Sequence, residues 1–328
     1  MVEEEPFSLT SIARFQRIPA KEFEKQYKDH LSGFKDWDQL EHAEEWLLFP
    51  ENIGEKLSID EVAVSNGELY TIVTNKAAHG KKKALVAIVS GTKATEVSQI
   101  LAGIAKEKRI AVKEVTLDMS PAMDAIVRNS FSSAALVTDR FHVQQLVSGA
   151  VQEIRINLRR EALKKENEEL KQCRKEKTKY VPTIFENGDT QKQLLARSQY
   201  LLFKAETKWT VSQKRRSEIL FVEFPELEKA YELAMMFRGC YEHSHCKEEA
   251  IESFKKWYTK VEEKQIEAFL VVADSIRLHQ ATILNYFTNR STNASAESFN
   301  AKLKGFRAVV RGVRDKKFFL FRIAKLYS

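Results

Sequence analysis

The chain has 328 residues, 43% of them hydrophobic and 30% charged, which is enough for one large domain or two to three ordinary ones. Its 53 Lys and Arg against 46 Asp and Glu give a formal net charge of +7, which favours a polyanionic partner. The acidic N-terminus is unlike a secretory signal, no apolar run is long enough to span a membrane, and three cysteines do not make a disulfide framework. We therefore exclude secreted and membrane classes and expect a cytoplasmic protein.

Residues 1–50 are expected to form a short helical segment ahead of the main fold. Residues 8–32 are predicted to be two helices joined by a tight turn, with Pro19 in the first turn of the second helix, where its missing N–H costs nothing. Five apolar side chains would make a small core between these helices: Ala13, Phe15, Ile18, Phe23 and Tyr27. The pattern leaves open both a DNA-binding helix-turn-helix and a plain helical hairpin.

From Leu57 on, apolar and polar side chains alternate with a period of two, which predicts strands. Residues 57–64 and 68–74 flank Asn66-Gly67, which is typical of a hairpin with a type I′ turn. Three further strands and two helices are predicted, the strands over 81–91, 110–118 and 133–139 and the helices over 92–108 and 121–131. The resulting α/β order, β-β-β-α-β-α-β, is the ribonuclease H-like arrangement of a mixed sheet.

Two aspartates occupy special places in this order. Asp60 lies in the middle of the first strand and Asp118 ends the fourth, and these strands are neighbours in a ribonuclease H-like sheet. Two carboxylates a few ångströms apart repel each other unless cations neutralise them. Two Mg²⁺ or Mn²⁺ ions, about 3.5–4 Å apart, would do so and would clamp a phosphodiester, with Glu297 from a later helix as a third ligand. Any one of these acids alone is more simply a solvated surface residue, so the prediction depends on the ordered set.

Three sequence blocks resemble bacterial insertion-sequence transposases of the DDE class, in the ISL-three group and closest to its ISAon-type members. The blocks are LSIDEVAV from residue 57, VTLDMSPAMDAIVRNSFSSAALVTDRFHV from residue 115 and TNASAESFNAKLKGFRAV from residue 292. Ser298 stands where the family usually has glycine. The resemblance covers residues 50–328 and implies Asp60, Asp118 and Glu297 as the catalytic, metal-binding acids of a DNA transposase.

The resemblance also implies how the domains are arranged. Nearly everything from 145 to 287 has helical, amphipathic spacing and is too long for a loop. In related transposases this region is an all-helical insertion that interrupts the catalytic fold. We therefore expect a catalytic core in two parts, 51–144 and 288–328, with the third acid on the C-terminal helices.

The second block contains another candidate, Asp139, in the sequence Asp-Arg-Phe-His. The predicted strand order favours Asp118 as the second catalytic acid, because the fourth strand lies next to the first. Asp139 and His142 would then be supporting residues that order the strand-to-helix corner or contact DNA. Asn300, in the third block, is a further supporting residue.

Basic residues near the third acid are predicted to contact DNA: Lys302, Lys304, Arg307, Arg311 and Arg314. A second basic set on the inserted helices is either a phosphate track or a solvated helix face: Arg155, Arg159, Arg160, Lys164 and Lys165. Cys240, His243, His245 and Cys246 are zinc-ligand types, but their tight spacing favours a plain helix end.

The function expected from these features is DNA transposition with two Mg²⁺ or Mn²⁺ ions as cofactor. Water would cut at the transposon end, and the freed 3′-OH would attack target DNA. The partners would be terminal inverted repeats and target DNA, with a homodimer or higher oligomer at the nucleoid and a possible separate protein that supplies an N-terminal region. The alternatives are a ribonuclease H-like nuclease or resolvase, and a catalytically silent DNA-binding protein derived from a transposase.

Overall fold

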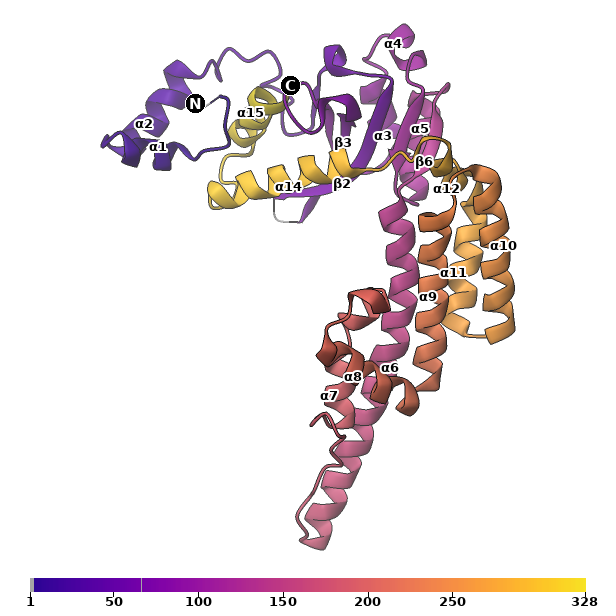
Figure 1. The fold of residues 1–328 in the computed structure, drawn as a ribbon. Helices are drawn as coiled ribbons and strands as arrows, with labels where there is room; N and C mark the ends of the chain where they lie inside the picture. The colour runs from indigo at the N-terminus through magenta and orange to yellow at the C-terminus, as the bar shows by residue number, and fades with distance from the viewer. Residues whose placement is uncertain (1–2, 66) are drawn as a thin grey trace. The chain divides into compact units, whose positions relative to one another are not determined.

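The structure is a computed structural model that describes residues 3–65 and 67–328 (Figure 1). The chain forms two compact units. The first unit runs to Asp139 and resumes at Asn289, and the second comprises Arg140–Thr288. None of the helices in the described residues combines the length and the apolar character needed to cross a membrane.

The first unit is built on a six-stranded mixed sheet with the order β1-β4-β3-β2-β5-β6. The strands are β1 (Trp46–Leu48), β2 (Lys56–Ser65), β3 (Glu68–Asn75), β4 (Leu85–Ser90), β5 (Glu114–Leu117) and β6 (Ala135–Thr138). Strands β2, β3 and β4 form an antiparallel meander, whereas β5 and β6 run parallel to β2. The mixed α/β class was predicted correctly, and Asn66 of the predicted hairpin turn lies outside the described residues.

Helices cover both faces of this sheet. On one face, Leu57 and Ile59 of β2 pack with α3 (Ala94–Leu101) and α5 (Pro121–Ser130). On the other face, Val62 and Val64 pack with α14 (Ala294–Val309) and α15 (Lys316–Tyr327). Because side chains alternate along a strand, Ser58 and Asp60 share the face of Val62 and lie where its apolar contacts end.

Three details differ from the sequence prediction. The helix expected over 92–108 is two helices, α3 and α4 (Lys106–Ile110), and the chain turns between them at Gly103, where an added Cβ would lie 3.1 Å from the Leu48 side chain. Strand β5 therefore begins at Glu114 and not at Ile110. Strand β1 was not predicted, because three residues are too few to show alternation; it pairs with the edge of β4.

The N-terminal segment is helical, as expected, but its apolar residues pack differently. Helices α1 (Leu9–Phe15) and α2 (Ala20–Gln26) are followed by a π-helical turn, η1 (Tyr27–Leu31). Tyr27 packs edge-on against Phe318 of α15, and Ala13 is buried. Phe15 and Ile18 are 79% and 42% exposed, so the prediction that they belong to the small core was wrong. The segment packs on α15 instead of forming a core of its own.

The second unit is all helical. Its longest helix, α6 (Arg140–Glu176), runs beside α9 in Figure 1. The other helices are α7 (Gln191–Arg197), α8 (Val211–Glu223), α9 (Pro225–His243), α10 (Lys247–Lys264), α11 (Glu267–Leu278) and α12 (Gln280–Leu284), and α13 (Tyr286–Asn289) leads back to the first unit. Trp257 is fully buried, packs on Phe237 and donates its indole N–H to the Leu233 carbonyl at 2.9 Å.

A buried aspartate, which lies between α6 and α7, forms ion pairs with both α7 and α8. Asp189 is fully buried and forms ion pairs with Arg197 of α7 and, at 3.0 Å, with Arg216 of α8. Helices α7 and α8 are thereby joined through one carboxylate. An acid held in this way is costly to remove, because both guanidinium groups lose a desolvated partner.

We predict that Asp189→Asn destabilises the second unit by about 3 kcal/mol, since the substitution removes the charge and keeps the shape. Hydrogen exchange measured by mass spectrometry would show faster exchange in α7 and α8. Glu262→Gln, which breaks the exposed ion pair with Arg277, is the control and should change stability by about 0.5 kcal/mol or less. Equal exchange in the two variants would contradict the role of Asp189.

Candidate functional site

Three aspartates, which we call the aspartate row, fall in register on or just beyond three neighbouring parallel strands, β2, β5 and β6. Strands β2 and β5 pair from Lys56 opposite Glu114 to Ser58 opposite Thr116. The same offset, continued by two residues, puts Asp60 opposite Asp118. Strands β5 and β6 pair up to Leu117 opposite Thr138, so the next residues in register are Asp118 and Asp139. The row follows from strand register alone.

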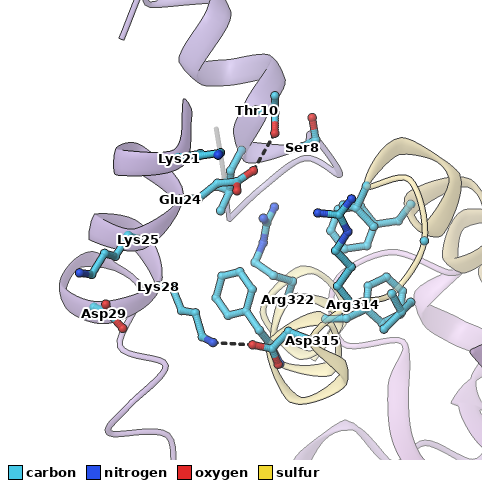
Figure 2. A pocket seen from close by; sticks show the side chains of 17 residues that line it. Ser8, Thr10, Lys21, Glu24, Lys25, Lys28, Asp29, Arg314, Asp315 and Arg322 are labelled. Carbon is cyan, nitrogen blue, oxygen red and sulfur yellow. Dashed lines mark hydrogen bonds and ion pairs between the residues drawn. The ribbon is translucent and has the colours of Figure 1, made fainter. Parts of the chain in front are cut away.

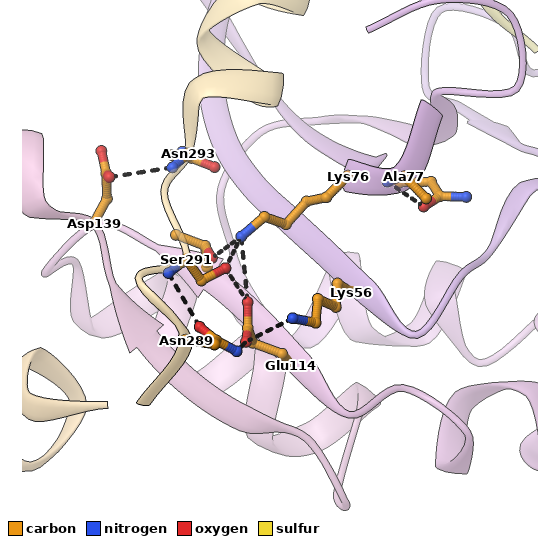
Figure 3. A network of polar contacts seen from close by, with 10 residues as sticks. Lys56, Lys76, Ala77, Glu114, Asp139, Asn289, Ser291 and Asn293 are labelled. Atoms are coloured by element: carbon orange, nitrogen blue, oxygen red, sulfur yellow. Dashed lines mark hydrogen bonds and ion pairs between the residues drawn. The ribbon is translucent and has the colours of Figure 1, made fainter. Parts of the chain in front are cut away.

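A different donor holds each aspartate. Asp60 accepts hydrogen bonds from the Asn300 side-chain amide at 2.6 Å and from the Glu61 backbone N–H at 2.8 Å. Asp118 accepts from the backbone N–H of Ser120 at 2.8 Å, which fixes the turn after β5. Asp139 is only 2% exposed and accepts from the backbone N–H of Asn293 at 3.2 Å (Figure 3). Asp60 and Asp139 are therefore bound to the two ends of one segment, 293–300.

Helix α14 carries Glu297 between these two contacts. Asn293, Glu297 and Asn300 are spaced by four and three residues, which puts them on one side of the helix. Asn293 reaches the Asp139 end of the row, and Asn300 reaches the Asp60 end. Glu297 is exposed on the same side of the first turn. Among the described residues, no three His, Cys, Asp or Glu side chains converge closely enough to hold a metal ion.

The electrostatics of this sheet edge suit a cation. Burial raises the pKa of the Glu61 carboxyl, and the negative charges of Asp118 and Asp60 raise it further. The side-chain carbonyl oxygens of Asn293 and Asn300 are buried and accept no hydrogen bond within the described residues. The available donors are thus all oxygens, the type that Mg²⁺ and Mn²⁺ prefer, so the residues present fit the predicted ions.

A buried polar network surrounds Glu114, which lies two same-face positions before Asp118 along β5. Glu114 is 5% exposed in β5 and accepts hydrogen bonds from Lys76 at 3.2 Å, Asn289 at 2.5 Å and Ser291 (Figure 3). Lys76 also donates to Thr116 at 2.8 Å. Asn289 and Ser291, which precede α14, are thereby fixed to β5, the strand that precedes Asp118.

The charge of Glu114 is maintained despite its burial. Burial alone would raise the pKa of this carboxyl, but hydrogen bonds from Ser291 and Asn289 and the charge of Lys76 outweigh it and hold the pKa below the ordinary value. The network is therefore an ionic anchor for the start of α14. Sequence analysis missed it; the only signal was a charged residue inside the strand-like run at 114–117.

The basic residues predicted near the third acid fall into two groups. Lys302 donates to the Gly80 carbonyl at 2.8 Å and Arg307 to the Ala63 carbonyl at 3.4 Å, so both support the packing of α14. Lys304, Arg311 and Arg314 are exposed. Arg314 lines a cavity of about 530 Å³ between α2 and the start of α15, where Lys28 pairs with Asp315 (Figure 2).

The candidate DNA-binding and supporting residues of the second unit have mixed surroundings. Arg155 is 6% exposed and donates to the Leu195 carbonyl at 3.0 Å, so it belongs neither to an exposed phosphate track nor to a solvated helix face. The other members of that set, Arg159, Arg160, Lys164 and Lys165, are exposed on α6. His142 is half-buried in the first turn of α6, edge-on to Phe141.

The Cys and His group at the end of α9 has the features of a plain helix end. Burial raises the pKa of the Cys240 thiol to about 12, and its Sγ lies 3.4 Å from the Met236 carbonyl in the preceding turn. Zinc binds the thiolate, so this environment opposes the metal. His245 is exposed, and its backbone N–H donates to Glu249.

Comparison with known proteins gives one family. A family model described as a transposase, of the ISL-three group with the DDE label, matches residues 57–323. The match therefore covers the aspartate row, the helical second unit, and α14 with Glu297. No curated protein and no solved structure matches the chain.

We predict that Glu114→Gln loses stability mainly at neutral pH. A carboxyl whose pKa is lowered on folding stabilises the native state above its unfolded pKa, and this contribution disappears as the pH falls through the folded pKa. Urea unfolding of the two proteins should therefore differ most near pH 7 and converge in acid. A difference that stays constant with pH would contradict an ionic role.

We also predict that Asp118→Asn lowers the pKa of Glu61. The substitution removes a negative charge that disfavours ionisation of Glu61, whereas the burial of Glu61 is unchanged. Carbon-13 NMR titration of the glutamate carboxyls would measure the shift. Asp124→Asn, which instead frees the exposed Arg128, is the control. An unchanged Glu61 pKa in Asp118→Asn would show that the two carboxyls do not share one edge.

Proposed function

The chain belongs to the ISL-three group of DDE transposases, and on that premise we propose that it cuts DNA at transposon ends and joins the freed strand to target DNA. The observation that carries this proposal is the row of Asp60 and Asp118 on neighbouring strands, with Glu297 on the helix that binds Asp60 through Asn300. We interpret the sheet as a ribonuclease H-like core and the second unit as its insertion. The substrate is the DNA phosphodiester backbone.

The proposed cofactor is a pair of Mg²⁺ or Mn²⁺ ions held by Asp60, Asp118 and Glu297. When bound, such ions supply positive charge to a phosphodiester in transit and lower the pKa of a water nucleophile. Asp60 would serve both ions, since it lies opposite Asp118 and is bonded through Asn300 to the helix that carries Glu297. The exposure of Glu297 leaves this side chain able to turn toward the strands when the acids are neutralised.

The remaining polar residues would hold the acids in place. The amide of Asn300 orients the Asp60 carboxylate by donating one hydrogen bond to it. Glu114 and Lys76 fix the segment that begins α14, and so determine how Glu297 faces the strands. These residues act before any substrate binds, because their contacts are already formed.

The structure gives Asp118 and Asp139 different surroundings, and these support Asp118 as the second catalytic acid. Asp139 is nearly completely buried and bonds to the backbone N–H of Asn293, at the N-terminal end of α14. Asp118 is only half-buried and bonds to its own turn. We propose that Asp139 positions α14, whereas Asp118 is accessible to metal and DNA.

We predict that Asp60→Asn, Asp118→Asn and Glu297→Gln each reduce DNA cleavage and strand transfer by about 100-fold or more, because each loses one charged ligand. Cleavage of labelled transposon-end DNA in Mg²⁺ is the measurement. Glu96→Gln, an exposed acid paired with Lys93, is the matched control. Asp139→Asn should reduce thermal stability as well as activity. Full activity in any one of the three acid variants would remove that residue from the site, and cleavage without strand transfer by the unmodified chain would favour a nuclease.

A further inference from the structure

The turn between β3 and β4 carries an exposed run of positive charge that the proposed function has not used. Lys81, Lys82 and Lys83 are consecutive and exposed, and His79 just before them is exposed too. Some other exposed lysines pair with acids, as Lys113 does with Glu55 at 2.7 Å. Within the described residues, no salt bridge involves any of these three lysines. The charge of Lys82 also acts on the exposed Glu4 carboxyl, so an external anion would compete with one surface acid for this turn.

The β3–β4 turn is hydrogen-bonded to β5 and α14, two of the elements that form the candidate site. Lys76, where the turn begins, is bound to Glu114 and Thr116 of β5. In the middle of the turn, the Gly80 carbonyl accepts a hydrogen bond from Lys302 of α14 at 2.8 Å. Gly80 also packs so closely on α14 that an added Cβ would lie 3.4 Å from the Ser298 hydroxyl.

The backbone of the turn is held in a conformation that its side chains do not favour. His79 and Lys83 have φ angles of 50° and 66°, in the left-handed region where residues other than glycine are uncommon. Such a residue costs on the order of 1 kcal/mol and persists where surrounding contacts fix it. Here those contacts include backbone hydrogen bonds from His79 to Lys76 and from Ala84 to Lys81, at 3.1 and 3.0 Å. The lysines are thus presented by a fixed turn and not by a loose loop.

The β3–β4 turn and the candidate acids lie beside the same part of α14, its first two helical turns. Gly80 is close to Ser295, Ser298 and Phe299 of this helix. Glu297 and Asn300, which define the acidic side, adjoin these residues in the sequence. At about 100° of rotation per residue, Ser298 and Lys302 lie on the opposite flank of α14 from Asn293 and Asn300. A polyanion that crosses the exposed side of α14 would meet the acids on one flank and the lysines on the other.

We infer that Lys81, Lys82 and Lys83 form a phosphate-binding turn that holds the DNA backbone across α14 beside the acidic row. The inference rests on the proposed function, because it specifies how the DNA substrate of that site is held. Lysines suit this task, since each is a point charge on a flexible stem and reads no sequence. Contacts of this kind contribute affinity that depends steeply on salt.

The test is the salt dependence of DNA binding by the triple variant K81Q/K82Q/K83Q in the full chain. Fluorescence anisotropy with a labelled duplex of about 30 base pairs, at several salt concentrations, gives the slope of log K against log salt. If each lysine neutralises one phosphate, the slope should fall by about 2 to 3 and affinity by about tenfold or more at low salt. Circular dichroism confirms that the variant is folded.

The matched control is K255Q/K256Q/K260Q on α10, which removes the same charge from lysines of which two pair with Glu252 and Glu263. This control should leave the slope nearly unchanged. An unchanged slope in the turn variant, or an equal fall in both variants, would overturn the inference while leaving the proposed function standing. Absence of salt-dependent DNA binding by the unmodified chain would contradict the proposed function itself.

Protection of lysines from acetylation would show independently where the DNA binds. Lysines of the full chain are labelled with an acetylating reagent, with and without the duplex, and are quantified by mass spectrometry. Lys81–Lys83 should become protected when DNA is present, whereas Lys255 should not. Equal labelling of the turn with and without DNA would place the DNA elsewhere and overturn the inference.

Discussion

The candidate site depends on one constraint, the parallel pairing of β5 with β2. Continued two residues past its last pair, Ser58 with Thr116, its register sets Asp60 opposite Asp118, and the register of β5 with β6 extends the row to Asp139. A slip of one residue would move every side chain of β5 to the other face of the sheet. Val115 and Leu117 are buried among α3 and α5, so such a slip would expose them and bury charges in their place. The hydrophobic core on one face thus fixes the acids on the other.

The second requirement is that α14 returns to the sheet in a definite place after the long helical unit. A chain that leaves the sheet at Asp139 and resumes at Asn289 has no local sequence rule to set its position. The ionic anchor at Glu114 sets it, together with the bond from Asn293 to Asp139. Burying a carboxylate costs free energy, which these hydrogen bonds and Lys76 offset. The anchor thereby fixes the start of the helix that carries Glu297.

Much of the fold could be predicted from the sequence, because its signals are local. Alternation in β2, β3 and β4 and helical spacing around Met123 and Phe299 identified most elements of the first unit. Strand order then placed Asp60 next to Asp118. Strand β1 was missed because it is too short to alternate. Phe15 was wrongly assigned to a core, because the N-terminal segment packs on α15 through Tyr27 and leaves Phe15 exposed.

Residues that act through long-range contacts could not be predicted. Glu114 and Asn289 are 175 positions apart, and neither has a motif. Arg155 has the helical spacing of a solvated face, but the carbonyl of Leu195 gives it a buried partner. The three lysines of the β3–β4 turn are consecutive in the sequence, but only the packing of Gly80 on α14 connects them with the acids.

The central claim is that Asp60, Asp118 and Glu297 share one metal site. The most direct test replaces Mg²⁺ with Fe²⁺ and uses ascorbate and peroxide to generate hydroxyl radicals at the bound ion, so that the backbone is cut nearby. Mass spectrometry should locate cuts around residues 60, 118 and 297 together, all lost in Asp60→Asn and suppressed by excess Mg²⁺. Cuts that cluster elsewhere, or that leave the segment around Glu297 intact, would contradict the shared site.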